Sequence, residues 1–259
     1  MDQARHYICK SCMSSVARGH KFCGRCGEPI PAEVMDPQIA YYSDMQDPSK
    51  ARLTLIHGKG MEGLSYHLKA GEHVVGRNGQ VEFPDDEYVS PKHANFFYRN
   101  DKLVVRDEGS LNGVYLRIRD TVSLSPGDHL MLGGQVFRVD LTPHASDAAD
   151  ADGTAFYSSP KADSAFRVTQ LLSGGIAGTT VCSKDSSITI GREDCDMNLS
   201  SDTHLNLHHC TITLSGGTLE LTDQITRNGT YVRIKSEVEL GHGDYVFIGR
   251  KLLRVELNA

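Results

Sequence analysis

The chain has 259 residues, of which 39% are hydrophobic, enough for one large globular domain or two of ordinary size. Its 27 basic and 33 acidic residues give a net charge of -6, so the whole molecule has no general attraction for nucleic acid or anionic lipid. The N-terminal residues lack the basic region and apolar run of a signal peptide, and no stretch approaches the roughly 18 apolar residues of a membrane span. We therefore expect a soluble, cytoplasmic protein in which any anion-binding site is local.

Two Cys-x-x-Cys pairs stand in residues 1–30, Cys9 with Cys12 and Cys23 with Cys26, ten residues apart. Each pair places two thiolates on one tight turn, and a tetrahedral zinc ion needs two such turns face to face. The segment resembles a short zinc ribbon, with one structural Zn²⁺ that supplies most of its folding energy. A redox dithiol or an iron–sulfur site is the alternative, although both usually have a different scaffold or spacing.

The ribbon also carries five basic and two acidic residues. Such an excess is able to contact nucleic acid, but a solvated face is the simpler interpretation. The prolines and missing periodicity of residues 31–50 predict a linker. Residues 51–142 then contain short alternating strands broken by turns, such as Arg52-Leu53-Thr54-Leu55-Ile56, with almost no helical periodicity.

The pattern of residues 51–142 returns in residues 165–259. Val75-Gly76-Arg77 matches Ile190-Gly191-Arg192, and from His93 and His209 to the C-terminus the repeats keep a constant offset of 116 residues. Residues 143–164 between them are rich in Ala, Asp and Ser and predict a second linker. We therefore expect an all-β protein with two sandwiches in tandem, each folded from its own repeat, and not a solenoid.

Three groups of residues at predicted strand ends of the first repeat form a family pattern. They are Gly76-Arg77, Ser90-Pro91-Lys92-His93 and the run from Asp107 to Gly113. In this order and spacing they resemble the forkhead-associated (FHA) domain, and the resemblance covers nearly all of residues 51–141. It implies an FHA β-sandwich that binds a peptide containing phosphothreonine.

The chemistry of a phosphate dianion accounts for these residue types. Several donors are needed at once, and an Arg guanidinium meets two phosphate oxygens while a hydroxyl and backbone N–H groups meet the others. The resemblance implies that Arg77 and Ser90 hold the phosphate and that the Asn112 side-chain amide holds the peptide backbone. It also implies that His93 is buried and shapes the loops, while Lys92 adds charge at the rim of the site.

Two positions depart from the family pattern. Leu111 stands where some members carry Thr, and Pro91 follows Ser90 where a polar residue often contacts the phosphate. Both departures bear on the affinity of the site for phosphate, because each removes a polar group that some members of the family place beside it.

The second repeat keeps less of the pattern. Asn206 stands where the first repeat has Ser90, so its phosphate site is predicted to be weaker, although an Asn amide still donates hydrogen bonds. The alternative is a structural or protein-interaction module that does not bind phosphate. The residues of this possible second site are Arg192, Asn206, Thr226 and Asn228. The three other cysteines, Cys182, Cys195 and Cys210, are expected to be ordinary core residues rather than redox or metal groups.

No nucleophile–base set, P-loop or kinase signature stands at motif spacing, so we expect no enzymatic activity. The leading hypothesis is an adaptor in Ser/Thr kinase signalling, whose zinc ribbon docks to one partner and whose sandwiches bind a Thr-phosphorylated protein. One alternative is a regulator whose ribbon contacts nucleic acid, which salt-dependent binding of DNA or RNA would favour. The other is an assembly protein that works without phosphate.

The second linker suggests self-regulation. Thr142 and Thr154 lie in or beside it, so phosphorylation there would create an internal ligand for the first sandwich. Mass spectrometry of the protein from its native cell tests this hypothesis, because absence of phosphate on both residues would remove its basis.

Overall fold

The computed structural model divides the chain into two compact units, Met1–Gln46 and Asp47–Ala259. The residues that it describes are 7–16, 20–30, 51–57, 60–69, 71–143, 149–159 and 163–257. The predicted linker over residues 31–50 lies outside them. Within the described residues, no helix is long and apolar enough to cross a membrane.

The first unit contains one two-stranded sheet, in which β1 (Tyr7–Ile8) pairs antiparallel with β2 (Ser15–Val16). Its buried cluster consists of four residues, Cys9, Val16, Cys23 and Ile30. Because two of these four are cysteines, the apolar core of the described residues is very small.

The described residues of the second unit form mainly strands, with a 3-10 turn, η3, at Ser173–Gly175. The first repeat forms β3 (Ala51–His57), β4 (Met61–His67), β5 (His73–Gly76), β6 (Val81–Glu82), β7 (Ala94–Arg99), β8 (Lys102–Asp107), β9 (Val114–Arg117), β10 (Val122–Leu124), β11 (Asp128–Leu132) and β12 (Gln135–Leu141). The second repeat forms β13 (Phe166–Leu171), β14 (Ala177–Cys182), β15 (Ser187–Gly191), β16 (Met197–Asn198), β17 (His208–Ser215), β18 (Thr218–Asp223), β19 (Thr230–Arg233), β20 (Val238–Leu240), β21 (Tyr245–Ile248) and β22 (Lys251–Leu257).

These strands make one ten-stranded sheet, β14-β13-β12-β11-β19-β9-β21-β22-β3-β4, and two five-stranded sheets, β20-β8-β7-β5-β6 and β10-β18-β17-β15-β16. Two separate buried clusters lie between them. In the first sandwich, β20-β8-β7-β5-β6 packs on the half of the large sheet from β9 to β4. In the second sandwich, β10-β18-β17-β15-β16 packs on the half from β14 to β19. The all-β fold with two sandwiches is as predicted.

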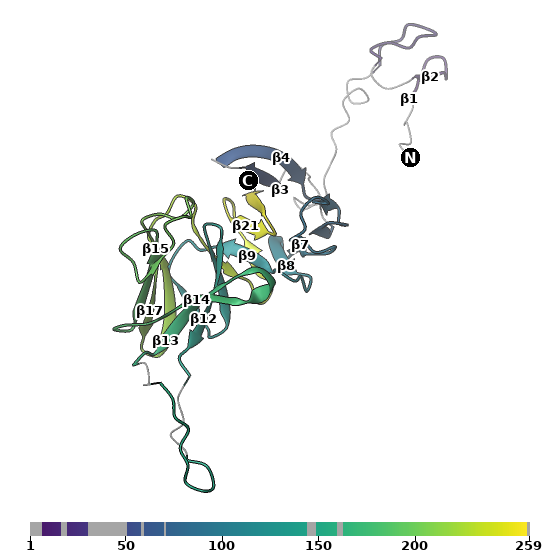
Figure 1. The fold of residues 1–259 in the computed structure, drawn as a ribbon. Helices are drawn as coiled ribbons and strands as arrows, with labels where there is room; N and C mark the ends of the chain where they lie inside the picture. The colour runs from purple at the N-terminus through teal and green to yellow at the C-terminus, as the bar shows by residue number, and fades with distance from the viewer. Residues whose placement is uncertain are drawn as a thin grey trace. The chain divides into compact units, whose positions relative to one another are not determined.

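The last three strands of each repeat are exchanged between the sandwiches. β20 pairs with β8 and β22 with β3, whereas β10 pairs with β18 and β12 with β13. Figure 1 accordingly places the C-terminus beside β3 and β4. The core of the first sandwich takes five buried residues from the second repeat: Leu240, Val246, Ile248, Leu253 and Val255. The structure therefore differs from the expectation that residues 51–142 and 165–259 each fold into a sandwich of their own.

The exchange occurs where β9 and β19 pair antiparallel, with Val232 opposite Leu116. After these strands, short links over residues 118–121 and 234–237 lead each chain segment into the other sandwich. Because the two repeats have nearly the same apolar pattern, an exchanged hairpin fills the same space as the original one, as in domain swapping between subunits.

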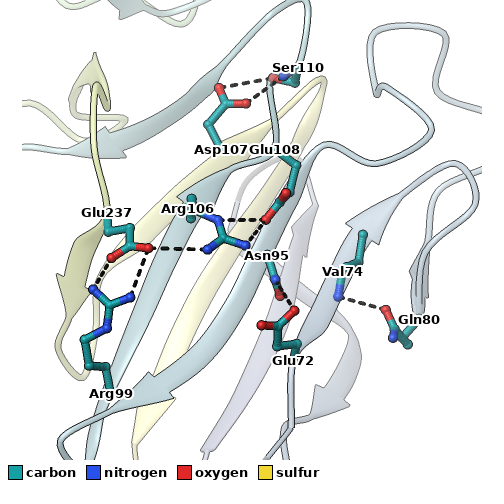
Figure 2. Close-up of polar contacts among 10 residues, drawn as sticks. All are labelled: Glu72, Val74, Gln80, Asn95, Arg99, Arg106, Asp107, Glu108, Ser110 and Glu237. Carbon is teal, nitrogen blue, oxygen red and sulfur yellow. Dashed lines mark hydrogen bonds and ion pairs between the residues drawn. The ribbon is translucent and has the colours of Figure 1, made fainter.

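Charge complementarity favours the exchanged pairing. Glu237 of the second repeat pairs with Arg99 and also with Arg106, at 3.4 Å, and Figure 2 shows it between these two guanidinium groups. Lys102 pairs with Glu239 at 2.6 Å. At the 116-residue offset, the first repeat has Thr121 and Ser123 in place of these two acids. Exposed ion pairs contribute only about 0–1 kcal/mol each, so they select between equivalent hairpins rather than stabilise the fold.

The exchange also determines where the second linker begins. β12 runs antiparallel to β11, β11 runs antiparallel to β19, and β19 runs antiparallel to β9. β12 therefore runs opposite to β9, and its C-terminal residue lies at the end of the sheet where β9 begins. Thr142 follows β12, and its hydroxyl lies 3.1 Å from that of Ser164. Thr154 is exposed and lies in a turn. The Asp150 N–H closes this turn by donating a hydrogen bond to the Thr154 carbonyl oxygen at 2.8 Å. Of the two linker threonines, Thr154 is the accessible one.

Candidate functional site

The end of β5 approaches the loop before β7 very closely. A Cβ atom on Gly76 would lie 2.2 Å from the Pro91 carbonyl oxygen, so only glycine fits here. The backbone N–H of Arg77 donates to the Ser90 carbonyl at 3.1 Å. The sequence separates Arg77 and Ser90 by thirteen positions, and this contact makes them neighbours.

The side chain of Arg77 is free to bind a ligand. It is exposed, and its guanidinium makes no hydrogen bond or ion pair with any described residue. An exposed guanidinium that pairs with no described carboxylate, on a backbone that contacts the Ser90 loop, is suited to an anion such as a phosphate.

His93 fixes the shape of the Ser90 loop. Its ring is fully buried, with Nδ1 accepting from the Ser90 N–H at 2.9 Å and Nε2 lying 3.0 Å from the Gly113 carbonyl oxygen. Burial lowers the pKa of His93 below its ordinary value, which favours the neutral ring that this pair of bonds requires. His93 thus joins two loops and has no exposed surface for a ligand.

The loop after β8 brings Asn112 to the same place. The Asp107 carboxylate accepts from the N–H of Ser110 at 2.7 Å and from its hydroxyl at 3.2 Å, as Figure 2 shows. The N–H of Leu111 donates to the Ser90 hydroxyl oxygen at 3.2 Å. The Asn112 side-chain amide donates to the Tyr88 carbonyl at 2.8 Å. The three predicted loops therefore meet at one end of the first sandwich.

The remaining predicted residues lie on the rim. Lys92 and Pro91 are exposed, and Leu111 is 85% exposed. Two residues that shape this region were not found from the sequence. Asp86, 1% exposed, accepts from the Tyr88 N–H at 3.1 Å, and Tyr88 in turn holds Asn112. No signal in one sequence distinguishes these two residues from ordinary loop residues.

The second sandwich repeats the backbone geometry with different side chains. The N–H of Arg192 contacts the Asn206 carbonyl at 3.1 Å, and Asn228 donates to the His204 carbonyl at 2.7 Å. The Arg192 side chain, however, is half-buried, and its Nε atom is buried without a hydrogen-bond partner. An arginine in this position reaches less solvent than Arg77 does.

Thr226 does not lie at the surface of this second site. It is 3% exposed, and its hydroxyl donates to the Asp223 carboxylate at 2.7 Å while accepting from the Gly229 N–H at 3.1 Å. It occupies the structural position of Ser110 in the first repeat. Its hydroxyl shapes the loop from inside and is not available to a phosphate.

The four N-terminal cysteines form one cluster. All four sulfur atoms of Cys9, Cys12, Cys23 and Cys26 lie within 4.8 Å of one another. The Cys9–Cys26 and Cys12–Cys23 sulfur separations are 3.6 and 3.5 Å. Tetrahedral zinc with Zn–S bonds of about 2.3 Å requires sulfur atoms roughly 3.8 Å apart, so the donor set and its spacing fit a zinc ion.

The other cysteines do not behave alike. Cys210 is buried in the core of the second sandwich, and burial raises the pKa of its thiol, as expected for an inert core residue. Cys182 is exposed rather than buried, so the expectation of a core residue is wrong for it. Cys195 is half-buried, and its thiol lies 3.4 Å from His208 Nδ1.

A family model described as the FHA domain matches the chain twice, at residues 73–133 and 188–249. Among curated proteins, the chain is 32% identical over 94 residues to an oxoglutarate dehydrogenase inhibitor of Corynebacterium diphtheriae. That match covers 35% of this chain and 66% of the relative, so the chain spans about two thirds of the relative's length.

Two solved structures are also similar in part. The FHA domain of the CT664 protein from Chlamydia trachomatis aligns with a TM-score of 0.34 and 12% identity, covering 82% of this chain and 100% of that chain. A structure from a study of phosphothreonine-dependent FHA domain interactions aligns with a TM-score of 0.30 and 12% identity, covering 81% and 98%. Because one family model matches each repeat across its loop-bearing strands, this chain belongs to the FHA-domain family and carries two copies of the domain.

Proposed function

We propose that this protein is a non-enzymatic adaptor whose first sandwich binds a phosphothreonine peptide through Arg77, Ser90, Lys92 and Asn112. The observation that carries this proposal is the meeting of three loops, in which the Arg77 backbone contacts the Ser90 carbonyl while the Arg77 guanidinium is exposed and pairs with no described residue. FHA domains bind phosphothreonine, and the name of the curated relative is that of an inhibitor, not of a catalyst. Both support a regulatory binding protein.

In this proposal the zinc ribbon and the two sandwiches have different functions. The cysteine cluster holds one structural zinc ion and presents the ribbon to a docking partner. The first sandwich captures a protein that a Ser/Thr kinase has phosphorylated on threonine. The second sandwich, with Arg192, Asn206 and Asn228, contributes at most weakly to phosphate binding, because it lacks the Ser90 hydroxyl and its arginine is half-buried.

Replacing Arg77 by Ala tests the site. Wild type, Arg77→Ala and Arg192→Ala would each be titrated onto an array of phosphothreonine peptides with varied flanking residues. We expect Arg77→Ala to lose about 2 kcal/mol or more of binding free energy, roughly 30-fold in affinity, because a charge-assisted fork to phosphate is removed. Arg192→Ala, the matched change in the other repeat, should leave affinity within about twofold.

Each other outcome has a definite meaning. Equal binding by wild type and Arg77→Ala would reject this site. Loss in Arg192→Ala alone would move phosphate recognition to the second sandwich. If the wild type binds no phosphopeptide on the array, the phosphate-independent assembly protein becomes the better account.

A further inference from the structure

The exchanged hairpin brings a turn of the second repeat against the first binding site. This turn joins β21 to β22 and contains Gly249 and Arg250. A Cβ atom on Gly249 would lie 2.6 Å from the Val89 side chain, so the turn is in close contact with the loop that carries Ser90. The backbone N–H of Arg250 donates to the buried Asp86 carboxylate at 2.9 Å, which fixes the turn in place.

The side chain of Arg250 lies over the same loop. Its guanidinium stacks on the Tyr88 ring at 5.0 Å, and its Nε atom lies 3.4 Å from Asp86. The Tyr88 carbonyl is the group that holds Asn112. Arg250 therefore contacts the residue that positions the proposed peptide-binding amide.

Arg250 nevertheless keeps free donors. Its side chain is 61% exposed, and no described residue makes a hydrogen bond with its two terminal nitrogens. A guanidinium that is oriented by an aromatic face and one carboxylate loses little freedom when it binds a second carboxylate. These open nitrogens are suited to an acidic side chain of a bound peptide.

The equivalent turn of the first repeat has a different character. It contains Gly133 and Gly134, has no charge, and packs in the second sandwich, where the Gly134 N–H donates to Asp202 at 2.9 Å. If each repeat closed on itself, this neutral turn would stand beside Tyr88. The strand exchange thus places the cationic turn, with Arg250 and Lys251, at the site that keeps Arg77 and Ser90.

We propose that Arg250, supplied by the second repeat, is a specificity-determining residue of the first site and selects phosphothreonine peptides with an acidic residue near the phosphothreonine. This inference rests on the proposed function of that site. The phosphate would bind at Arg77 and Ser90, the peptide backbone at Asn112, and an Asp or Glu side chain of the peptide at the terminal nitrogens of Arg250.

Paired peptides test this role. Each pair carries phosphothreonine and differs only by Glu or Gln at one flanking position, and the positions are taken in turn. We expect the wild type to prefer Glu at one position by about three- to tenfold, the range of a preorganised but solvent-accessible charge pair. Arg250→Gln should abolish that preference while binding of the Gln peptide stays within about twofold, because the backbone contact with Asp86 remains.

Two further variants make the result specific. Lys251→Gln removes the same charge from the neighbouring residue, whose ammonium lies over Phe83 at 5.6 Å, and it should keep the preference. Arg250→Lys keeps the positive charge but loses the planar guanidinium, and it should keep part of the preference for Glu. An unchanged preference in Arg250→Gln, no preference in the wild type, or equal loss in Lys251→Gln would overturn the role of Arg250. Failure of the wild type to bind any of the phosphopeptides would overturn the proposed function together with it.

Discussion

Cutting the chain in its second linker is expected to leave the two halves bound to each other. A protease site would replace the exposed turn between Asp150 and Thr154. After cleavage, each half still has its last three strands buried in the sandwich of the other half. An unexchanged tandem would instead release two independent domains, so cleavage distinguishes the two arrangements directly.

The size of the exchanged core explains this expectation. The first sandwich buries five apolar residues of the second repeat, and the second sandwich buries five of the first: Leu124, Leu130, Leu132, Phe137 and Val139. At about 1.5–3 kcal/mol each, burial of these ten side chains supplies the attraction that holds the cleaved halves together.

Size-exclusion chromatography and native mass spectrometry at nanomolar concentration measure the result. One complex with the mass of the intact chain is expected, and two separate folded fragments would contradict the exchange. A matched pair of substitutions supports the assignment. Leu253→Ala in the second repeat should speed amide hydrogen exchange in the first sandwich. Phe137→Ala in the first repeat should speed it in the second sandwich. Each substitution is expected to lower the free energy of unfolding of the affected sandwich by about 2–5 kcal/mol.

Removing zinc is expected to unfold the ribbon and leave the sandwiches intact. The described core of the first unit consists of Cys9, Val16, Cys23 and Ile30, which buries too little apolar surface to hold the segment together. Structural zinc supplies about 10–16 kcal/mol of apparent binding free energy to such segments, so its loss removes the folded state. The second unit has its own cores and does not depend on the metal.

Metal analysis and amide NMR spectra before and after chelation under reducing conditions measure this effect. The bound metal should amount to one zinc ion per chain, and resonances of residues 7–30 should collapse to random-coil positions while those of the sandwiches stay unchanged. Cys23→Ser provides the matched variant without a chelator and should give the same spectrum. A ribbon that stays folded without metal would reject the structural role of zinc.

The sequence predicts the strands and the meeting of the site loops because local patterns determine both. Alternating apolar residues define the strands, and Gly76 and Gly113 stand where the backbone needs glycine, for close approach or for a φ of 83°. The exchange is different, because Leu253 and Phe137 are equally good core residues at equivalent positions. Apolar pattern alone does not assign either hairpin to its sandwich.

A weaker signal for the exchange was present in the charges. Glu237 of the second repeat pairs with Arg99 and Arg106, and the first repeat has Thr121 at the equivalent position; Arg106 also pairs with Glu108 of its own repeat. Pairs of this kind are informative only after the strands have been aligned across the two repeats. The burial of Thr226 and the position of Arg250 depend on the tertiary arrangement, so they required the structure.

The central claim is that the first sandwich recognises phosphothreonine, and one titration tests it most directly. A peptide chosen from the array would be prepared with phosphothreonine, phosphoserine, glutamate or unmodified threonine at the central position and titrated calorimetrically into the intact protein. We predict that the phosphothreonine form binds at least roughly 30-fold more tightly than the glutamate and unmodified forms, because only a phosphate dianion satisfies the Arg77 fork and the Ser90 hydroxyl together. Equal affinity for the phosphorylated and unmodified peptides would contradict the account.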